Sequence, residues 1–145
     1  GNPSMQVLKE FLEMRIAVEP QAAALAAQRC NPEKVAAIGE ALARMRSAPN
    51  DSAEVMEADI DFHISVLYAS ENRFYIRMRD FVRTALKVSI AHTNIIREDF
   101  DEVVEDHAKV YLAIKSGDVV AARAAMHFLM DEALTYIESE LKKIA

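Results

Sequence analysis

An aspartate and several histidines interrupt the apolar stripes expected of buried helices, and these residues are the best suited to chemistry. Asp59 and His63 stand four positions apart, so on a helix their side chains meet on one face. The other residues at helical spacing are apolar: Met56, Ile60, Val66 and Leu67. A carboxylate on a buried face needs a hydrogen-bond partner or a cation, because desolvating it alone is costly. The pair therefore indicates either a buried Asp–His hydrogen bond or part of a metal site.

Two further histidines lie on apolar stripes. His107 stands among Val103, Val104, Val110, Tyr111 and Ile114, and His92 stands among Phe81, Ala85 and Val88. A single histidine in such a place is most simply a hydrogen-bonded core residue. Two histidines with a carboxylate, however, are a common ligand set for Zn²⁺ and similar divalent ions. Asp59, His63 and His107 together therefore favour a metal site with coordination positions left open for water or a small anion.

Two arginines are candidates for binding a carboxylate ligand. Arg15 interrupts the apolar face of the first predicted helix, and Arg83 lies midway along the fifth. The guanidinium group is a planar, bidentate partner for carboxylates. The simpler interpretation of each arginine is a surface salt bridge. His127 shares its helix face with charged residues, which indicates a boundary position, and we leave it out of the site.

The rest of the sequence predicts an all-α protein, an antiparallel bundle of six to seven helices that positions these residues. Only three Gly and four Pro occur, and alternating β-branched runs between turn residues are missing. Caps, breakers and periodicity place helices at about 5–17, 20–29, 32–46, 52–69, 72–93, 98–116 and 118–143. The first break is expected before Pro20, since the residue preceding a proline avoids the helical region. Short loops favour antiparallel neighbours.

Length and composition restrict the class of protein. The 145 residues suit one domain, and we interpret 1–4 as a tag remnant or linker and 5–145 as the domain. A net charge of −6 repels phosphate backbones, so this chain alone should not bind nucleic acid. Cys30, the sole cysteine, excludes an internal disulfide and fits the cytoplasm. No apolar run approaches the roughly 20 residues of a membrane span, so we expect no membrane association.

Three segments carry motifs that resemble those of one family, in the same order and spacing. LEMRIAVEPQAAALAAQ resembles an opening E-x-R-x-x-x-E followed by an Ala-rich helix. ADIDFHISVLYASEN resembles a D-x-x-F-H…A-S-x-N signature, and DHAKVYLAIKSGDVVAARAAM resembles a third block that ends in methionine. The matching residues are Glu13, Arg15, Glu19, Asp59, Phe62, His63, Ala69, Ser70, Asn72, His107, Ala113, Ile114, Gly117, Asp118 and Met126. The family is the FCD domain, the effector-binding half of FadR-type regulators in the GntR family.

The resemblance implies a helical bundle with an internal ligand cavity. In many members a divalent metal, held by Asp and His, helps to bind a small carboxylic acid. Carried over residue by residue, Asp59, His63 and His107 match three ligand positions, and Zn or Ni is the expected metal. The family's usual fourth ligand is a histidine three residues after the methionine of the third block, and here that position is Leu129. Either three ligands suffice, or His92 completes the set, or the domain is metal-free.

We therefore predict the effector-sensing domain of a bacterial transcription regulator, acting as a homodimer and not as an enzyme. A small organic or sugar acid would bind the metal, with Arg15, Arg83, His92 and Asn94 as its other contacts. DNA binding would come only from a winged-helix domain that is missing from this chain. Two alternatives are a metal-dependent enzyme, although no extra base or nucleophile accompanies the histidines, and a metal-free structural dimerisation module.

Overall fold

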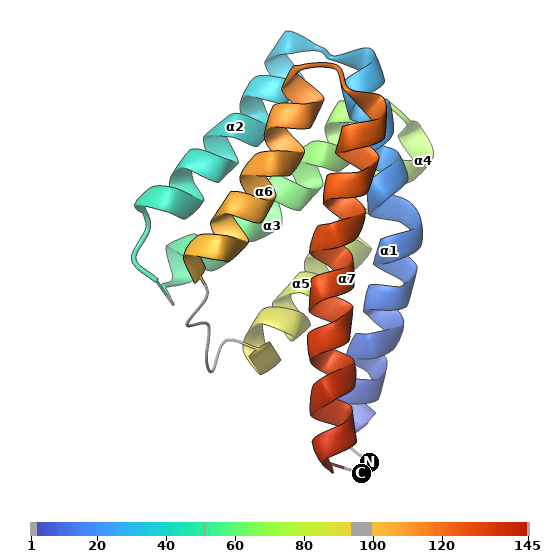
Figure 1. The fold of residues 1–145 in the computed structure, drawn as a ribbon, viewed down its shortest axis with the longest axis vertical. Helices are drawn as coiled ribbons and strands as arrows, with labels where there is room; N and C mark the ends of the chain where they lie inside the picture. The colour runs from blue at the N-terminus through green and yellow to red at the C-terminus, as the bar shows by residue number, and fades with distance from the viewer. Residues whose placement is uncertain (1–2, 51, 94–99, 145) are drawn as a thin grey trace.

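The computed structural model describes residues 3–50, 52–93 and 100–144. Within these ranges the chain forms seven α-helices and no β-strand, which confirms the all-α prediction (Figure 1). In chain order the helices are α1 (Pro3–Arg29), α2 (Pro32–Ser47), α3 (Ala53–Ala69), α4 (Arg73–Ile76), α5 (Arg79–Thr93), α6 (Phe100–Lys115) and α7 (Val119–Ile144). None of the helices so described combines the length and the apolar character that a membrane crossing requires.

Several helix ends follow the capping signals of the sequence. At the start of α2, Asn31 Oδ1 accepts hydrogen bonds from the backbone N–H groups of Glu33 and Lys34, at 3.1 and 3.4 Å. After α6, Gly117 has a φ of +73°, in the left-handed region where glycine is favoured. These residues satisfy or redirect backbone groups that a helix end leaves without partners. Both predicted limits of α2 and the predicted end of α6 therefore agree closely with the structure, while the predicted start of the sixth helix at 98 lies outside the described residues.

The predicted helix break at Pro20 is wrong, because α1 continues through this residue. A proline inside a helix removes one backbone hydrogen bond and costs about 3 kcal/mol. The face of α1 is buried on both sides of the proline, with Arg15 and Glu19 before it and Ala23 after it. Most helical stability in proteins comes from tertiary packing, so the burial of one long face outweighs the local preference of Pro20.

The single helix predicted over 72–93 is also wrong, because the structure divides it into α4 and α5. Asn72 caps α4 as expected, and its Oδ1 accepts hydrogen bonds from the N–H groups of Phe74 and Tyr75. The Met78 N–H then donates to the Tyr75 carbonyl oxygen, three residues back, at 3.0 Å. Such a bond tightens the last turn of a helix, so the chain turns here before α5 begins.

The helices pack as the antiparallel bundle that the sequence predicted. Figure 1 shows α1 and α7 running antiparallel along the long axis, with both chain ends at one end of the molecule. α2 packs on α3 and α6 packs on α7, while α3 also contacts α1 and α5. The main core joins residues of α1, α2, α3, α5, α6 and α7. A smaller apolar cluster near the chain ends consists of Met5, Leu8, Leu12 and Ile137.

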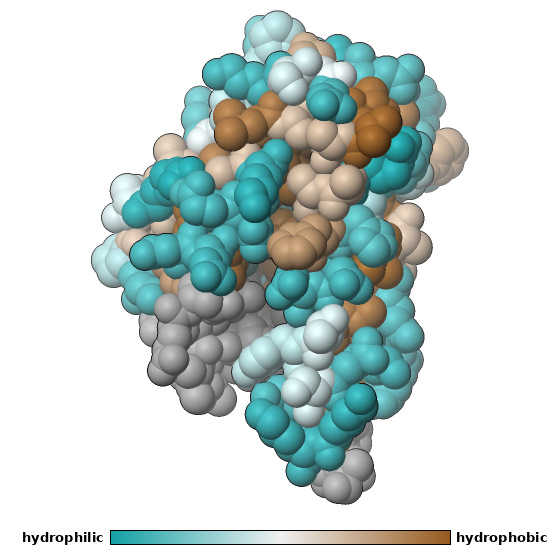
Figure 2. All heavy atoms as spheres, in the orientation of Figure 1, coloured by the Kyte–Doolittle hydropathy of each residue, from teal (hydrophilic) through white to brown (hydrophobic). Residues whose placement is uncertain are grey.

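Polar residues lie mostly on the outside of this bundle. Figure 2 shows hydrophilic residues over much of the face that α2, α6 and α7 form. Among the described residues, the buried polar or charged ones are Arg15, Glu19, His63, Ser70 and His107. Charged groups are rarely buried without partners, because desolvation costs several kcal/mol for each ion. The arginine, the glutamate and the two histidines therefore mark the part of the interior where chemistry can take place.

Candidate metal centre

Side chains from three helices meet in the interior. α1 contributes Arg15 and Glu19, α3 contributes Asp59 and His63, and α6 contributes His107. His63 and His107 are each 2% exposed, and the Asp59 side chain is 13% exposed. The structure brings together the aspartate and two histidines that the sequence singled out. One possible ligand atom from each lies within 4.8 Å of the other two.

Both imidazole rings direct the same nitrogen toward Asp59. His63 Nε2 lies 3.3 Å from Asp59 Oδ1, and His107 Nε2 lies 3.2 Å from the same oxygen. The two Nε2 atoms are 3.3 Å apart. One carboxylate oxygen and two ring nitrogens, each able to offer a lone pair, therefore converge on a small volume.

The opposite nitrogen of each ring has its own partner. His107 Nδ1 lies 2.7 Å from the carbonyl oxygen of Val103, one turn earlier on α6. His63 Nδ1 lies 2.5 Å from Glu19 Oε1 on α1. A carbonyl or an ionised carboxylate oxygen can only accept, so each Nδ1 carries the hydrogen of the bond. In the neutral ring, Nε2 is then the unprotonated nitrogen that can bind a metal.

This arrangement fits a divalent cation. Three lone-pair donors facing one another at about 3.3 Å repel unless a positive charge lies among them. Either a metal ion or a proton on one imidazole can supply that charge. Two imidazoles and one carboxylate are a ligand set for Zn²⁺ and related ions, with positions left for a further ligand. A hydrogen-bonded Nδ1 on each ring is also the usual support of a metal-binding histidine.

An aromatic ring covers the two histidines. Phe62, on α3 beside His63, is fully buried. Its ring centroid lies 5.5 Å from that of His63 and 4.9 Å from that of His107, and both contacts are edge-on. An apolar neighbour of this kind excludes water and strengthens the electrostatic interactions of the site.

The ionisation of the site follows from its burial and its pairs. Burial raises the pKa of Glu19, but Arg15 and His63 outweigh it through charge and hydrogen bonds and lower that pKa from 4.5 to about 2. Burial likewise raises the pKa of Asp59, yet hydrogen bonds and positive charge from His107 and His63, which a ring supplies when its Nε2 carries a proton, hold that pKa well below its usual value. For His63, burial lowers the pKa, but Glu19 and Asp59 raise it above the ordinary 6.5. A proton on His63 is therefore the natural competitor of a metal ion.

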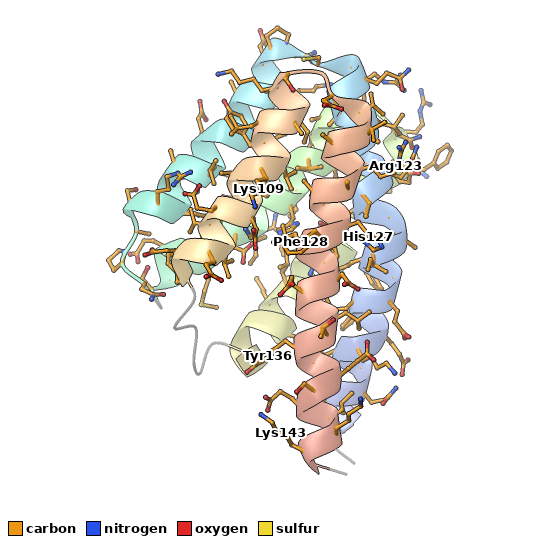
Figure 3. All side chains as sticks on the ribbon, viewed as in Figure 1. Lys109, Arg123, His127, Phe128, Tyr136 and Lys143 are labelled. Carbon is orange, nitrogen blue, oxygen red and sulfur yellow. The ribbon has the colours of Figure 1, made fainter. Side chains whose placement is uncertain are left out.

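The structure describes the other residues that the sequence analysis considered for the site only in part. Arg83, on α5, is half-buried, and no ion pair joins it to another described residue. The backbone of His92 belongs to α5, but its side chain and the whole of Asn94 lie outside the described residues. Leu129 is buried in the main apolar core. Figure 3 shows His127 on α7, and this histidine is exposed, which agrees with leaving it out of the site.

Arg15 and Glu19 differ most from expectation. The interpretation of Arg15 as a surface salt bridge is wrong, because Arg15 is 2% exposed and its Nε donates to Glu19 inside the protein. Sequence reasoning missed Glu19 as a site residue because it placed a helix end there, next to Pro20. The signal that could have found it is the spacing of four residues from Arg15, which puts both side chains on one face of a continuous helix.

Comparison with known proteins supports the family suggested by the sequence motifs. A family model described as the FCD domain matches residues 10–132. The HTH-type transcriptional regulator LutR of Bacillus subtilis (strain 168) is 28% identical over 124 residues, which cover 82% of this chain and 57% of that protein. An Escherichia coli (strain K12) protein named for the regulation of an L-lactate dehydrogenase operon is 32% identical over 124 residues, 81% of this chain and 46% of that protein.

A solved structure shows the same fold. Streptococcus agalactiae GntR matches with a TM-score of 0.78 and 17% identity, over 93% of this chain and 61% of its own. This chain spans about half the length of the two curated relatives named above. The family model extends over every site residue from Arg15 to His107, and the family predicted from three sequence blocks is confirmed. The chain belongs to the FCD domain family.

Proposed function

We propose that this chain is the effector-sensing part of a bacterial transcription regulator. In this proposal it binds a small carboxylic acid through a divalent cation held by Asp59, His63 and His107. The supporting observation is the convergence of one carboxylate oxygen and two imidazole Nε2 atoms, spaced 3.2–3.3 Å apart. When bound, the cation supplies positive charge and open coordination positions to the acid. Zn²⁺ or Ni²⁺ suits such a mixed nitrogen and oxygen set.

The names of the relatives support the choice of regulator and effector class. Both curated relatives are named as regulators, and one is named for an L-lactate dehydrogenase operon. We therefore place L-lactate among the candidate acids, beside other hydroxy acids and sugar acids. DNA binding is assigned to a winged-helix domain outside this chain, in a homodimer that reads two-fold symmetric DNA. The acid would act by binding one arrangement of those domains more tightly than the other.

The remaining contacts of the acid stay predictions. Arg83 is a half-buried residue without an ion-pair partner among the described residues, and its guanidinium group is suited to a ligand carboxylate. Arg15 is already bonded to Glu19, so a ligand would have to share or displace that bond. His92 and Asn94 complete the set of residues that we predict to contact the acid. The internal cavity that would hold the acid also stays a prediction.

A thermal-shift screen tests the proposed function. Metal-loaded protein is heated with a panel of hydroxy acids, sugar acids and dicarboxylates. An acid at a hundredfold excess over its Kd stabilises the folded state by about 2.7 kcal/mol. For a domain of this size the Tm should rise by about 5–11 °C. Chelation should remove most of the shift, because the acid loses its main charge partner.

The other outcomes distinguish the remaining functions. A panel that gives no shift with metal-loaded protein contradicts the sensor. A shift that survives chelation keeps the sensor and discards the role of the metal. Conversion of a bound acid to product would indicate a metal-dependent enzyme, and binding of neither metal nor acid would indicate a structural dimerisation module.

A further inference from the structure

The two nitrogens of His63 have partners on opposite sides, and the partner on α1 has no assigned role. Nε2 faces Asp59 and His107, whereas Nδ1 faces Glu19. We propose that Glu19, itself held by Arg15, is a positioning residue that fixes which nitrogen of His63 faces the metal. This inference rests on the proposed metal site, and it assigns to the pair on α1 a role in metal binding.

Glu19 is held from both of its oxygens. Arg15 Nε donates to Oε2, and His63 Nδ1 donates to Oε1 at 2.5 Å. Glu19 is fully buried, so no bulk water competes for either bond. The carboxylate therefore has one orientation, and it connects α1 to α3 at the histidine that faces the proposed metal.

The geometry also favours one of the two ring nitrogens of His63 as the one that carries the hydrogen. An imidazole can carry its hydrogen on either nitrogen, and its ring can turn about the Cβ–Cγ bond. Each ring nitrogen of His63 faces a carboxylate, but Glu19 Oε1 lies 2.5 Å from Nδ1 whereas Asp59 Oδ1 lies 3.3 Å from Nε2. The shorter contact favours the tautomer with hydrogen on Nδ1, which leaves Nε2 free to bind a cation. Carboxylate partners of this kind also raise the basicity of a metal-binding histidine.

Arg15 acts through Glu19 in this arrangement. A carboxylate buried without a counter-charge would be costly, and the guanidinium supplies that charge. Arg15 Nη2 lies 3.4 Å from His63 Nδ1, but both groups carry hydrogens, so this approach is not a productive hydrogen bond. Arg15 thus stabilises the metal ligand His63 indirectly, through Glu19, which is a different role from contacting the effector.

Four variants test the proposal. Glu19→Gln keeps the shape and an acceptor oxygen, Glu19→Ala removes the partner, and Arg15→Gln removes the charge that holds Glu19. Glu13→Gln, on the exposed side of α1, is the matched control. Zn²⁺ affinity is measured by competition with a chelator, without any acid, after circular dichroism has established that each variant is helical.

We expect the affinity for Zn²⁺ to fall about 10- to 100-fold in Glu19→Ala and Arg15→Gln, less in Glu19→Gln, and not at all in the control. Folded variants of Glu19 that bind Zn²⁺ as tightly as the wild type would overturn the proposal. A folded Arg15→Gln variant that binds Zn²⁺ as tightly as the wild type would overturn the supporting role of Arg15.

A second measurement separates this inference from the proposed metal site. Nitrogen NMR of metal-free wild-type protein at alkaline pH, where the ring is neutral, should show the hydrogen of His63 on Nδ1. Hydrogen on Nε2 contradicts the positioning role whatever metal is bound. Hydrogen on Nδ1 in a wild-type protein that takes up no Zn²⁺ upholds the tautomer and refutes the metal site instead. This measurement also carries the test if Glu19→Ala does not fold.

Discussion

The buried carboxylate of Glu19 predicts a specific loss of stability in acid. Its pKa in the folded protein is about 2, against an ordinary value of 4.5. The unfolded chain therefore binds more protons between these values, and the free energy of unfolding falls as the pH is lowered through them. At about 1.4 kcal/mol for each pH unit, the difference corresponds to roughly 3 kcal/mol. This contribution is fully present above about pH 5 and nearly absent at about pH 2.

Urea unfolding of metal-free protein at several acidic pH values, monitored by circular dichroism, measures this loss. Glu19→Gln cannot titrate, so its free energy of unfolding should fall by roughly 3 kcal/mol less than that of the wild type over the same pH range. Exposed Glu13→Gln should behave like the wild type. Equal acid sensitivity in the wild type and Glu19→Gln would refute the assignment of a charged, paired Glu19 in the interior.

Three further predictions concern the metal. His63→Ala should abolish metal retention on a desalting column, whereas exposed His127→Ala should retain it. The affinity for the metal in titration calorimetry should rise with pH through and above 6.5. The pKa of His63 is raised, so its ring still carries a proton there, and metal binding must release that proton. An affinity that does not depend on pH would contradict this. Leu129→His, which restores the family's usual fourth ligand, should tighten Zn²⁺ binding in a chelator competition, and unchanged affinity would show that three ligands suffice.

Local signals in the sequence predicted much of the fold. The cap at Asn31 and the stop at Gly117 are readable because they depend on a few neighbouring residues. The continuation of α1 through Pro20 is not local, since it depends on the packing of α1 against the rest of the bundle. The turn between α4 and α5 contains neither Gly nor Pro, so no breaker in the sequence announces it.

The candidate site was predictable to the extent that its residues lie on apolar stripes. The spacing of Asp59 and His63, and the apolar neighbours of His107, placed all three in the interior. Glu19 escaped prediction because its partner His63 is 44 positions away and because Pro20 suggested a helix end. A long-range pair of this kind becomes visible only when the packing of α1 on α3 is known.

The metal content of the protein tests the central claim most directly. Protein purified without chelator is analysed for metals, and then dialysed against Zn²⁺ or Ni²⁺ and analysed again. The convergence of Asp59, His63 and His107 predicts close to one ion per chain, lost when Asp59 is replaced by Ala. Protein that holds no ion before dialysis and takes up none afterwards would contradict the claim and leave a proton as the cation among the three side chains.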